Sequence, residues 1–117
     1  MKSKKIIKPW GYEFLIEKNN KYMFKKLFMK KGHRCSLQFH KKKIETIFIV
    51  SGNLKIFYGK NKNQLRSKIF KPGKTITINP KIVHRMYAVS NCIYLEASTP
   101  EIKDVVRLSD DYRRKVI

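Results

Sequence analysis

The sequence predicts an all-β fold, either a sandwich or a barrel, and three features of its pattern support that class. Turn-forming residues recur at intervals of roughly ten residues, and the segments between them are short and rich in β-branched and aromatic side chains. No segment keeps a helical period except residues 109–114, where Ser109 could cap a short helix with Asp110 and Asp111 in its first turn. A length of 117 residues favours one domain, over residues 1–117.

Each expected strand is a run of aliphatic, β-branched or aromatic residues that stops at a turn signal. These signals are mostly glycine, proline and asparagine, at Gly32, Gly52, Gly59, Pro72-Gly73 and Asn79-Pro80. In chain order, the expected strands are residues 12–17, 22–29, 36–40, 44–50, 54–58, 68–70, 75–78, 86–89 and 93–97. A short helix or a turn over residues 109–114 is expected to follow them.

The charge of the chain is strongly basic and restricts the classes of partner. There are 28 Lys and Arg residues against 8 Asp and Glu, which gives a net charge of +20. This excludes an acidic, solvating protein and raises nucleic acids, anionic membranes and phosphorylated small molecules as partners. A nucleic-acid module is disfavoured because the sequence has no helix-turn-helix pattern and no zinc-finger spacing. The lysine runs at residues 2–5 and 41–43 are expected to be a frayed terminus and a solvated loop.

The cysteines and the hydropathy pattern bear on the compartment. Cys35 and Cys92 have no C-x-x-C spacing and are expected to be reduced, mostly buried thiols, with a disulfide or a catalytic thiol as the alternatives. The N-terminal segment lacks the apolar run of a signal peptide, and no apolar stretch approaches the ~20 residues of a membrane span. We therefore expect a cytoplasmic protein without a membrane partner.

One constellation of polar residues could carry chemistry. Strand alternation places Gln38 and His40 on the same face, Glu45 opens the next strand, and His84 begins a later one. Two imidazoles, a carboxylate and an amide oxygen could bind Zn, Mn, Fe or Ni, and two His with one carboxylate is the facial pattern of non-haem iron oxygenases. The alternative is a polar barrel interior that holds no metal.

The spacing of these residues relative to glycines resembles the cupin superfamily. The first cupin motif is matched by Gly32, Gln38, His40, Glu45 and Gly52, with Gln38 in place of the first histidine. The second motif is matched by Gly73 and His84, although Asn79 and Lys81 stand where proline and glycine are usual. The resemblance implies a small double-stranded β-helix, or jelly roll.

A narrower resemblance extends over nearly the whole chain. The segments KPWGYE, KKGHRCSLQFH, ETIFIVSG, VHR and STPEIKDVVRLSDDYRR look like small cupins similar to the C-terminal domain of type II phosphomannose isomerases and bifunctional mannose-1-phosphate guanylyltransferases. In that group glutamine is normal at the Gln38 position. The resemblance also implies a homodimer.

This resemblance implies roles for particular residues. Gln38, His40, Glu45 and His84 would bind a divalent metal ion, with zinc expected and manganese, iron or nickel as alternatives. Arg85 would contact sugar or phosphate, or form a structural ion pair. Glu96 would be the base or a buried partner. Arg107 would bind substrate or pair with Asp104 or Asp111, and His33 would lie at the surface or assist substrate binding.

The leading functional hypothesis is therefore a metal-dependent isomerase of the mannose 6-phosphate to fructose 6-phosphate type. Such chemistry needs a base that moves a proton between adjacent carbons and a cation that stabilises the developing negative charge. The alternatives are a metal cupin that acts on or binds another sugar or small acid, including an iron oxygenase, and a basic nucleic-acid-binding module.

Overall fold

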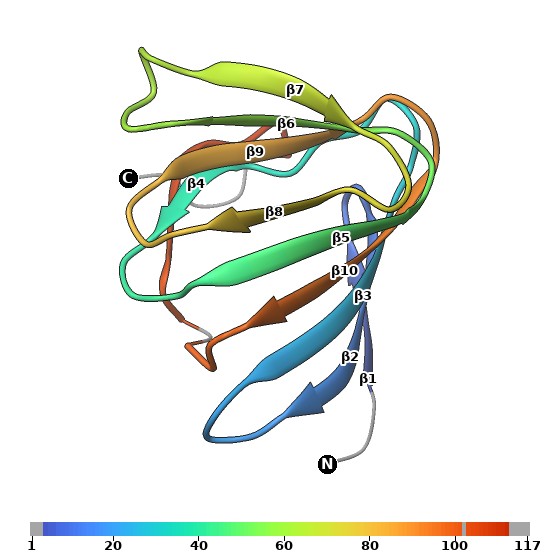
Figure 1. Cartoon of the computed structure of the whole chain (residues 1–117), viewed down its shortest axis with the longest axis vertical. Coiled ribbons are helices and arrows are strands. Elements are labelled where there is room, and N and C mark those ends of the chain that lie inside the picture. Colours follow the sequence, from blue (N-terminus) through green and yellow to red (C-terminus); the bar gives the residue numbers. More distant parts are fainter. Residues whose placement is uncertain (1–3, 102, 113–117) are drawn as a thin grey trace.

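Eleven strands and no helix are found in residues 4–101 and 103–112, the part of the chain that this computed structural model describes. Most of the strands expected from the sequence are present with small shifts at their ends (Figure 1). The strands are β1 (Lys4–Lys8), β2 (Gly11–Lys18), β3 (Met23–Met29), β4 (Leu37–His40), β5 (Glu45–Ser51), β6 (Leu54–Gly59), β7 (Arg66–Phe70), β8 (Thr75–Ile78), β9 (Val83–Ala88), β10 (Cys92–Ser98) and β11 (Val105–Ser109).

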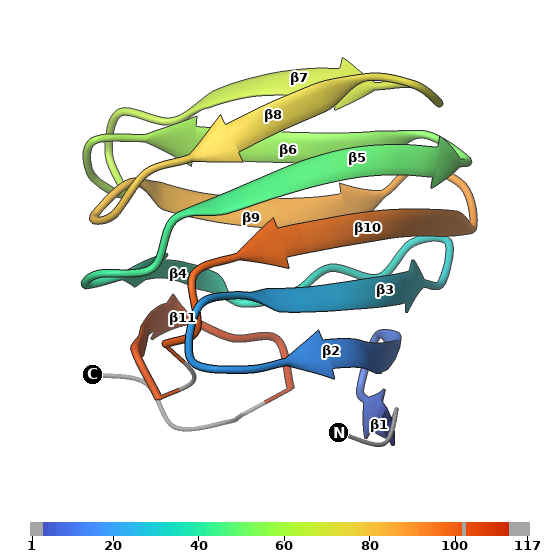
Figure 2. The ribbon, with the colours of Figure 1, turned by 60° about the horizontal axis from the view of Figure 1, so that its bottom comes forward.

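The strands form two antiparallel sheets that face each other. The larger sheet has the order β1-β2-β3-β10-β5-β8 and the smaller one has the order β11-β4-β9-β6-β7 (Figure 2). From β3 onward the chain passes repeatedly from one sheet to the other, as in β4, β5 and β6, and again in β8, β9, β10 and β11. This alternation is the double-stranded β-helix, or jelly roll, that the sequence predicts.

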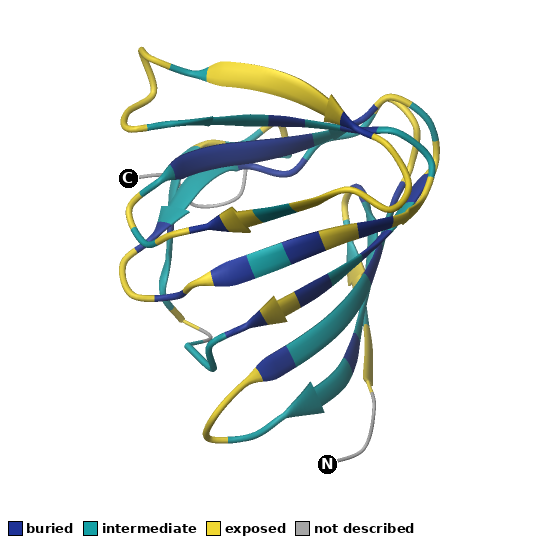
Figure 3. Cartoon of the chain, in the orientation of Figure 1, coloured by how far each residue is buried: buried dark blue, intermediate teal, exposed yellow. Residues whose placement is uncertain are grey.

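The apolar core and a polar region lie at opposite ends of the interior. Along β5, Glu45 is followed on the same face by Ile47 and Ile49, which are fully buried. Along β9, the inward positions run from His84 to Met86 and Ala88 in the same way. β9 is buried along almost its whole length, whereas the edge strand β7 is largely exposed (Figure 3). β5 and β9 therefore each carry a polar residue near one end and core residues beyond it.

One turn shows why a glycine of the first motif is needed. Gly52, between β5 and β6, has a φ of 77°, a conformation that other residues rarely adopt. A β-carbon added there would clash with the carbonyl oxygen of Asn91. Any larger residue would displace the segment that precedes β10.

Both ends of the described chain differ from the expectation. The lysine-rich terminus, expected to be frayed, forms β1 from Lys4 onward and pairs with β2, while Lys2 lies outside the described residues. Ser109 ends β11 rather than capping a helix, and Asp111 and Tyr112 form a turn. Of the helix and the turn expected over residues 109–114, the structure shows the turn as far as residue 112. Residues 113 and 114 lie outside the described part.

Two smaller expectations can also be compared with the structure. Cys35 and Cys92 are both buried, as expected, and they form no disulfide with each other. Within residues 4–101 and 103–112, no helix has the length and apolar character needed to cross a membrane.

Candidate metal centre

His40 and Glu45 are brought together by the turn between β4 and β5. His40 is the last residue of β4 and Glu45 the first of β5, and the start of β9 lies at the same end of the molecule (Figure 1). Asp104 holds the turn, because its Oδ2 accepts hydrogen bonds from the backbone N–H groups of Lys42 and Lys43, each 2.8 Å long. Burial acts to raise the pKa of Asp104, but these two donors outweigh it and keep the pKa below its ordinary value.

His84 is positioned by the turn that joins β8 to β9. The N–H of Ile82 bonds to Asn79 O at 3.3 Å, and Lys81 has a φ of 69°. With Pro80 second and a positive φ third, this is a type II turn. Lys81 therefore takes the conformation that glycine adopts in the usual motif, and its N–H bonds to His40 O at 2.7 Å. That bond ties the turn before His84 to the end of β4.

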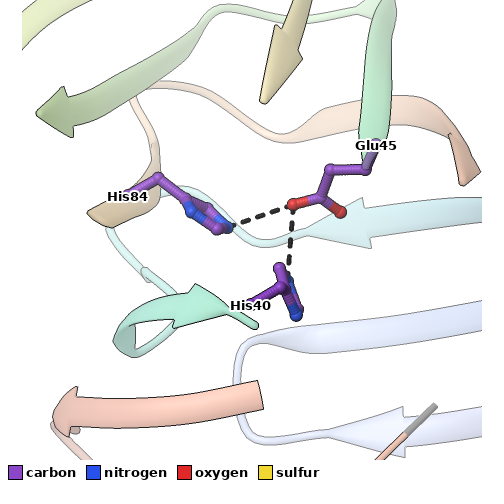
Figure 4. Close-up of side chains that lie close together, drawn as sticks. All are labelled: His40, Glu45 and His84. Carbon is purple, nitrogen blue, oxygen red and sulfur yellow. Dashed lines mark ion pairs between the residues drawn. The ribbon is translucent and has the colours of Figure 1, made fainter. Parts of the chain in front are cut away.

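Three buried side chains meet at this end of the interior (Figure 4). Glu45 Oε1 lies 3.1 Å from His84 Nε2 and 3.5 Å from His40 Nε2. One ligand atom from each residue lies within 4.8 Å of the other two. Two imidazole nitrogens and one carboxylate oxygen at this spacing are suited to a transition-metal ion.

The hydrogen bonding of His84 fits such an ion. Its Nδ1 lies 2.9 Å from Ile82 O, and because a carbonyl only accepts, Nδ1 carries the proton. The lone pair on Nε2 therefore faces Glu45, and Nε2 is buried with no hydrogen-bond partner among the described residues. A histidine that bonds a carbonyl through one nitrogen and leaves the other free is the usual arrangement of a metal ligand. His40, Glu45 and His84 could thus hold a metal ion.

Gln38 lies beside the three residues but has a different partner. It is the cross-strand neighbour of His84 and lines the same cavity. Its Oε1 accepts a hydrogen bond from the hydroxyl of the buried Ser36. Since an amide oxygen has two lone pairs, one remains for a metal ion. The role of Gln38 as a fourth ligand remains a prediction.

A buried lysine and a second glutamate adjoin the three residues. Lys43 Nζ lies 3.1 Å from Glu96 Oε2 and 3.9 Å from Glu45 Oε2. Burial acts to raise the pKa of Glu45, but the imidazoles of His40 and His84, when they are protonated, and the charge of Lys43 outweigh it and hold the pKa well below its ordinary value. Burial together with the charge of Glu45 raises the pKa of Glu96 to about 7, against the opposing effect of Lys43. The two carboxyl groups therefore have different protonation behaviour.

A cavity of about 300 Å³ connects these groups. Arg107 lines it from β11, and its Nε is buried without a hydrogen-bond partner within the described chain. Arg107 is paired with Gln38, which in turn is paired with His84, so the three residues form one row across the smaller sheet. Residues in such a row point to the same face. Neither Asp104 nor Asp111 forms an ion pair with Arg107 among the described contacts.

Arg85 and His33 lie away from the cavity. Arg85 follows His84 in β9 and so points to the opposite face of the sheet. Its Nε donates to Cys35 O at 2.8 Å, and its Nη2 lies 3.5 Å from Asp111 Oδ1. His33 contacts Tyr112, with Nδ1 2.9 Å from the hydroxyl. Of the two roles expected for Arg85, the structure shows the ion pair, which Arg85 forms with Asp111. The position of Arg85 outside the cavity gives no support to substrate binding.

Four charged residues that line the cavity, Lys8, Glu13, Lys25 and Lys43, were not among the expected site residues. Lys43 belongs to a run expected to be a solvated loop, but it is buried, and this expectation is wrong for Lys43. Lys25 and Glu13 form an ion pair of 3.2 Å at the cavity wall. Strand alternation could have revealed Lys25, because it shares a face with Met23, Leu27 and Met29. Lys43 is two residues before Glu45, the spacing of residues on one face.

The jelly roll with two histidines and a glutamate directed into its interior is that of a cupin. CapF, a capsular polysaccharide assembling protein from Staphylococcus aureus, has a TM-score of 0.81 at 13% identity, over 93% of this chain and 32% of CapF. Oxalate decarboxylase from Lactobacillus farciminis gives 0.76 at 18% identity, over 91% of this chain and 33% of the enzyme. KdgF from Halomonas sp. gives 0.71 at 12% identity, over 87% and 90% of the two chains. Identities this low establish the fold alone.

The family follows from a comparison of sequences. The family of the mannose-6-phosphate isomerase C-terminal region matches residues 1–110, and the chain belongs to this family. It spans about a third of the length of CapF and of the oxalate decarboxylase. A comparison with curated protein sequences gives no match.

Proposed function

We propose that the protein is a metal-dependent aldose–ketose isomerase that interconverts mannose 6-phosphate and fructose 6-phosphate. The observation that carries this proposal is the group His40, Glu45 and His84, buried at the end of a polar cavity with Glu96 beside it. Membership of the mannose-6-phosphate isomerase C-terminal family supports the choice of reaction and substrate.

A divalent cation, which we propose to be zinc, would bind His40, Glu45 and His84 and act as a Lewis acid toward sugar oxygens. Glu96 lies in the same cavity and is not needed as a ligand. Its carboxylate would accept the proton from the carbon next to the sugar carbonyl and return it to the adjacent carbon. Lys43 holds Glu96 at the wall through the 3.1 Å contact, so the base stays directed toward the substrate.

The anionic group of the substrate requires a basic partner, and Arg107 is better placed than Arg85. Arg107 lines the cavity, and its buried Nε has no partner among the described residues. A guanidinium group can bind a phosphate through two parallel hydrogen bonds. We propose that Arg107 binds the phosphate, while Arg85 holds the segment around Asp111.

The proposal is tested by assaying isomerisation of mannose 6-phosphate before and after chelation. Activity should disappear on chelation and return with zinc or manganese. Glu96→Gln should lower kcat about 10²–10⁴-fold without preventing metal binding. Glu17→Gln, which changes a glutamate outside the cavity, should leave the rate unchanged. Full activity after exhaustive chelation would contradict the proposal.

A second candidate is a metal cupin that acts on another sugar or a small acid. The observation that favours it is the donor set itself, because two histidines and one carboxylate are also the ligands of non-haem iron oxygenases. Oxygen uptake by the iron-loaded protein with a small acid, combined with no isomerisation of mannose 6-phosphate, would favour this candidate over the first.

A further inference from the structure

Lys43 is a buried lysine in a turn whose other lysines are exposed. Lys43 as a whole residue is 6% exposed, whereas Lys41 and Lys42 face solvent. Lysine is rarely buried unless its charge is compensated, because removal of an ammonium group from water is costly. Lys43 Nζ is compensated by two carboxylates, at 3.1 Å from Glu96 Oε2 and 3.9 Å from Glu45 Oε2.

The two oxygens of Glu45 have different neighbours. Oε1 lies 3.1 Å from His84 Nε2 and 3.5 Å from His40 Nε2, whereas Oε2 lies on the side of Lys43. The backbone of Lys43 is fixed as well, since its N–H bonds to Asp104 Oδ2 at 2.8 Å. The ammonium group is therefore held beside the oxygen that does not face the imidazoles.

We propose that Lys43 is a positioning residue that keeps Glu45 Oε2 away from the metal, so that Glu45 binds the ion through Oε1 alone. A glutamate free to use both oxygens would occupy a further coordination position. A catalytic metal site needs such a position open for substrate. Through its contact with Glu96, the same ammonium group holds the proposed base at the wall of the same cavity. This inference rests on the metal site of the proposed function and does not depend on which reaction occurs there.

The charge of Lys43 also affects the affinity for the ion. A fixed positive charge near a divalent cation opposes binding, and the opposition is strong in a buried site. Replacement of Lys43 by methionine keeps a long unbranched side chain but removes both the charge and the contact to Oε2. The substitution should therefore tighten metal binding and raise the coordination number.

The experiment compares Lys43→Met with wild type and with two further variants in the full chain. Lys43→Arg keeps the charge, and Lys42→Met removes an exposed lysine from the same turn. Calorimetric titration of the metal-free proteins with zinc should give about tenfold tighter binding for Lys43→Met and values within about threefold of wild type for the other two variants. In the cobalt-loaded proteins, the visible absorption should be weaker for Lys43→Met than for wild type, because absorption weakens when the coordination number of cobalt rises. The other two variants should keep the wild-type absorption.

Several results would overturn the inference. It fails if Lys43→Met has the zinc affinity and cobalt spectrum of wild type, or if it binds zinc more weakly with an unchanged spectrum. Should Lys43→Met not fold, Lys43→Met with Glu96→Gln removes the uncompensated charge and must show the same changes in affinity and spectrum. If wild type itself binds no zinc or cobalt, the proposed metal site fails and the inference fails with it. If wild type binds zinc and Lys43→Met has the same zinc affinity and the same cobalt spectrum, the inference fails but the proposed metal site stands.

Discussion

His40, Glu45 and His84 are buried polar residues whose contacts with one another leave part of their hydrogen-bonding capacity unused. His84 Nε2 and His40 Nδ1 are both buried without a hydrogen bond within the described chain. An unsatisfied buried polar atom typically destabilises a fold by about 1–3 kcal/mol. A bound cation would use the lone pair on His84 Nε2, so the fold without metal is expected to be less stable than the fold with it.

The first prediction follows from this difference. Zinc at about 100 times its Kd should raise the free energy of unfolding by about 2.7 kcal/mol, because the metal binds only the folded chain. Thermal unfolding with and without zinc measures the effect, and His84→Ala should remove it. An unchanged melting temperature for wild type at saturating zinc would contradict the prediction.

Lys81 is a second residue whose environment leads to a prediction. It has a φ of 69°, a left-handed conformation that costs a residue with a β-carbon roughly 1–2 kcal/mol. Lys81→Gly should therefore stabilise the protein by about 0.5–1 kcal/mol, after the greater flexibility of glycine in the unfolded chain is subtracted. Urea unfolding measures the change, with Lys74→Gly, at a position without a positive φ, as a destabilised or neutral control. A loss of stability in Lys81→Gly would show that the side chain has another role.

At the scale of elements, Asp111 fixes the segment that follows β11. Arg34 hydrogen bonds to both of its carboxylate oxygens, and Arg85 Nη2 lies 3.5 Å away. The hydrogen bond from Arg34 lowers the pKa of Asp111, burial acts in the opposite direction, and the charges of Arg34 and Arg85 lower it further. Because the pKa is lower in the folded protein, ionised Asp111 stabilises the fold above the unfolded pKa, and this stability is lost as pH falls through the folded pKa.

The third prediction is a pH-dependent effect of Asp111→Asn. The substitution should lower the free energy of unfolding by about 0.5–1 kcal/mol at pH 7, a small value because the group is partly exposed. The difference from wild type should be constant above about pH 5 and shrink below about pH 4. Urea unfolding over this range measures it. An equal difference at every pH would show that Asn disturbs packing rather than an ion pair.

The sequence predicts the central strands better than those at the sheet edges. Residues 44–50 and 54–58 are rich in apolar side chains, because both strands turn one face to the core. β5 and β6 match these two ranges closely. β1 has mostly exposed residues and lysine at three of its five positions, so its strand conformation depends on pairing with β2. β11 depends likewise on β4. Pairing partners of this kind are tertiary information that a local pattern does not contain.

The same distinction applies to the candidate site. The spacing of His40, Glu45 and His84 predicts their meeting, because each lies at a strand end held by a short turn. Arg85 was expected near substrate because it follows His84, but adjacent residues in a strand point to opposite faces. The sequence does not reveal the burial of Lys43, because residues 41–43 are all lysine and no local pattern separates the buried one from the two exposed ones. Its burial follows from Glu45 and Glu96, which come from different strands.

At the scale of the whole molecule, most of the positive charge lies outside the cavity. The chain has a net charge of +20, yet the cavity contains both acidic and basic residues. Lys8 and Lys25 there are each paired with Glu13. The surface charge would raise the local concentration of a phosphorylated sugar. It does not by itself define the chemistry of the site.

The resemblance implies a homodimer, and we propose that its two copies associate through the outer face of the larger sheet. Phe48 and Val50 of β5 are 38% and 46% exposed on this face, with Ile44 beside them. Light scattering after size exclusion should give twice the chain mass of 14.0 kDa. Phe48→Lys should reduce it to the mass of one chain, whereas Ile69→Lys, at an exposed position of β7 in the other sheet, should not. A wild-type mass of one chain would contradict the proposal.

The central claim is that His40, Glu45 and His84 bind one divalent metal ion. The most direct measurement is the metal content of the purified protein, by inductively coupled plasma mass spectrometry, after chelation, exposure to zinc and removal of free ion. One zinc per chain is expected for wild type, and none for His40→Ala with His84→Ala, with both proteins folded by circular dichroism. A wild type that retains no metal, or a double variant that retains one ion per chain, would contradict the claim.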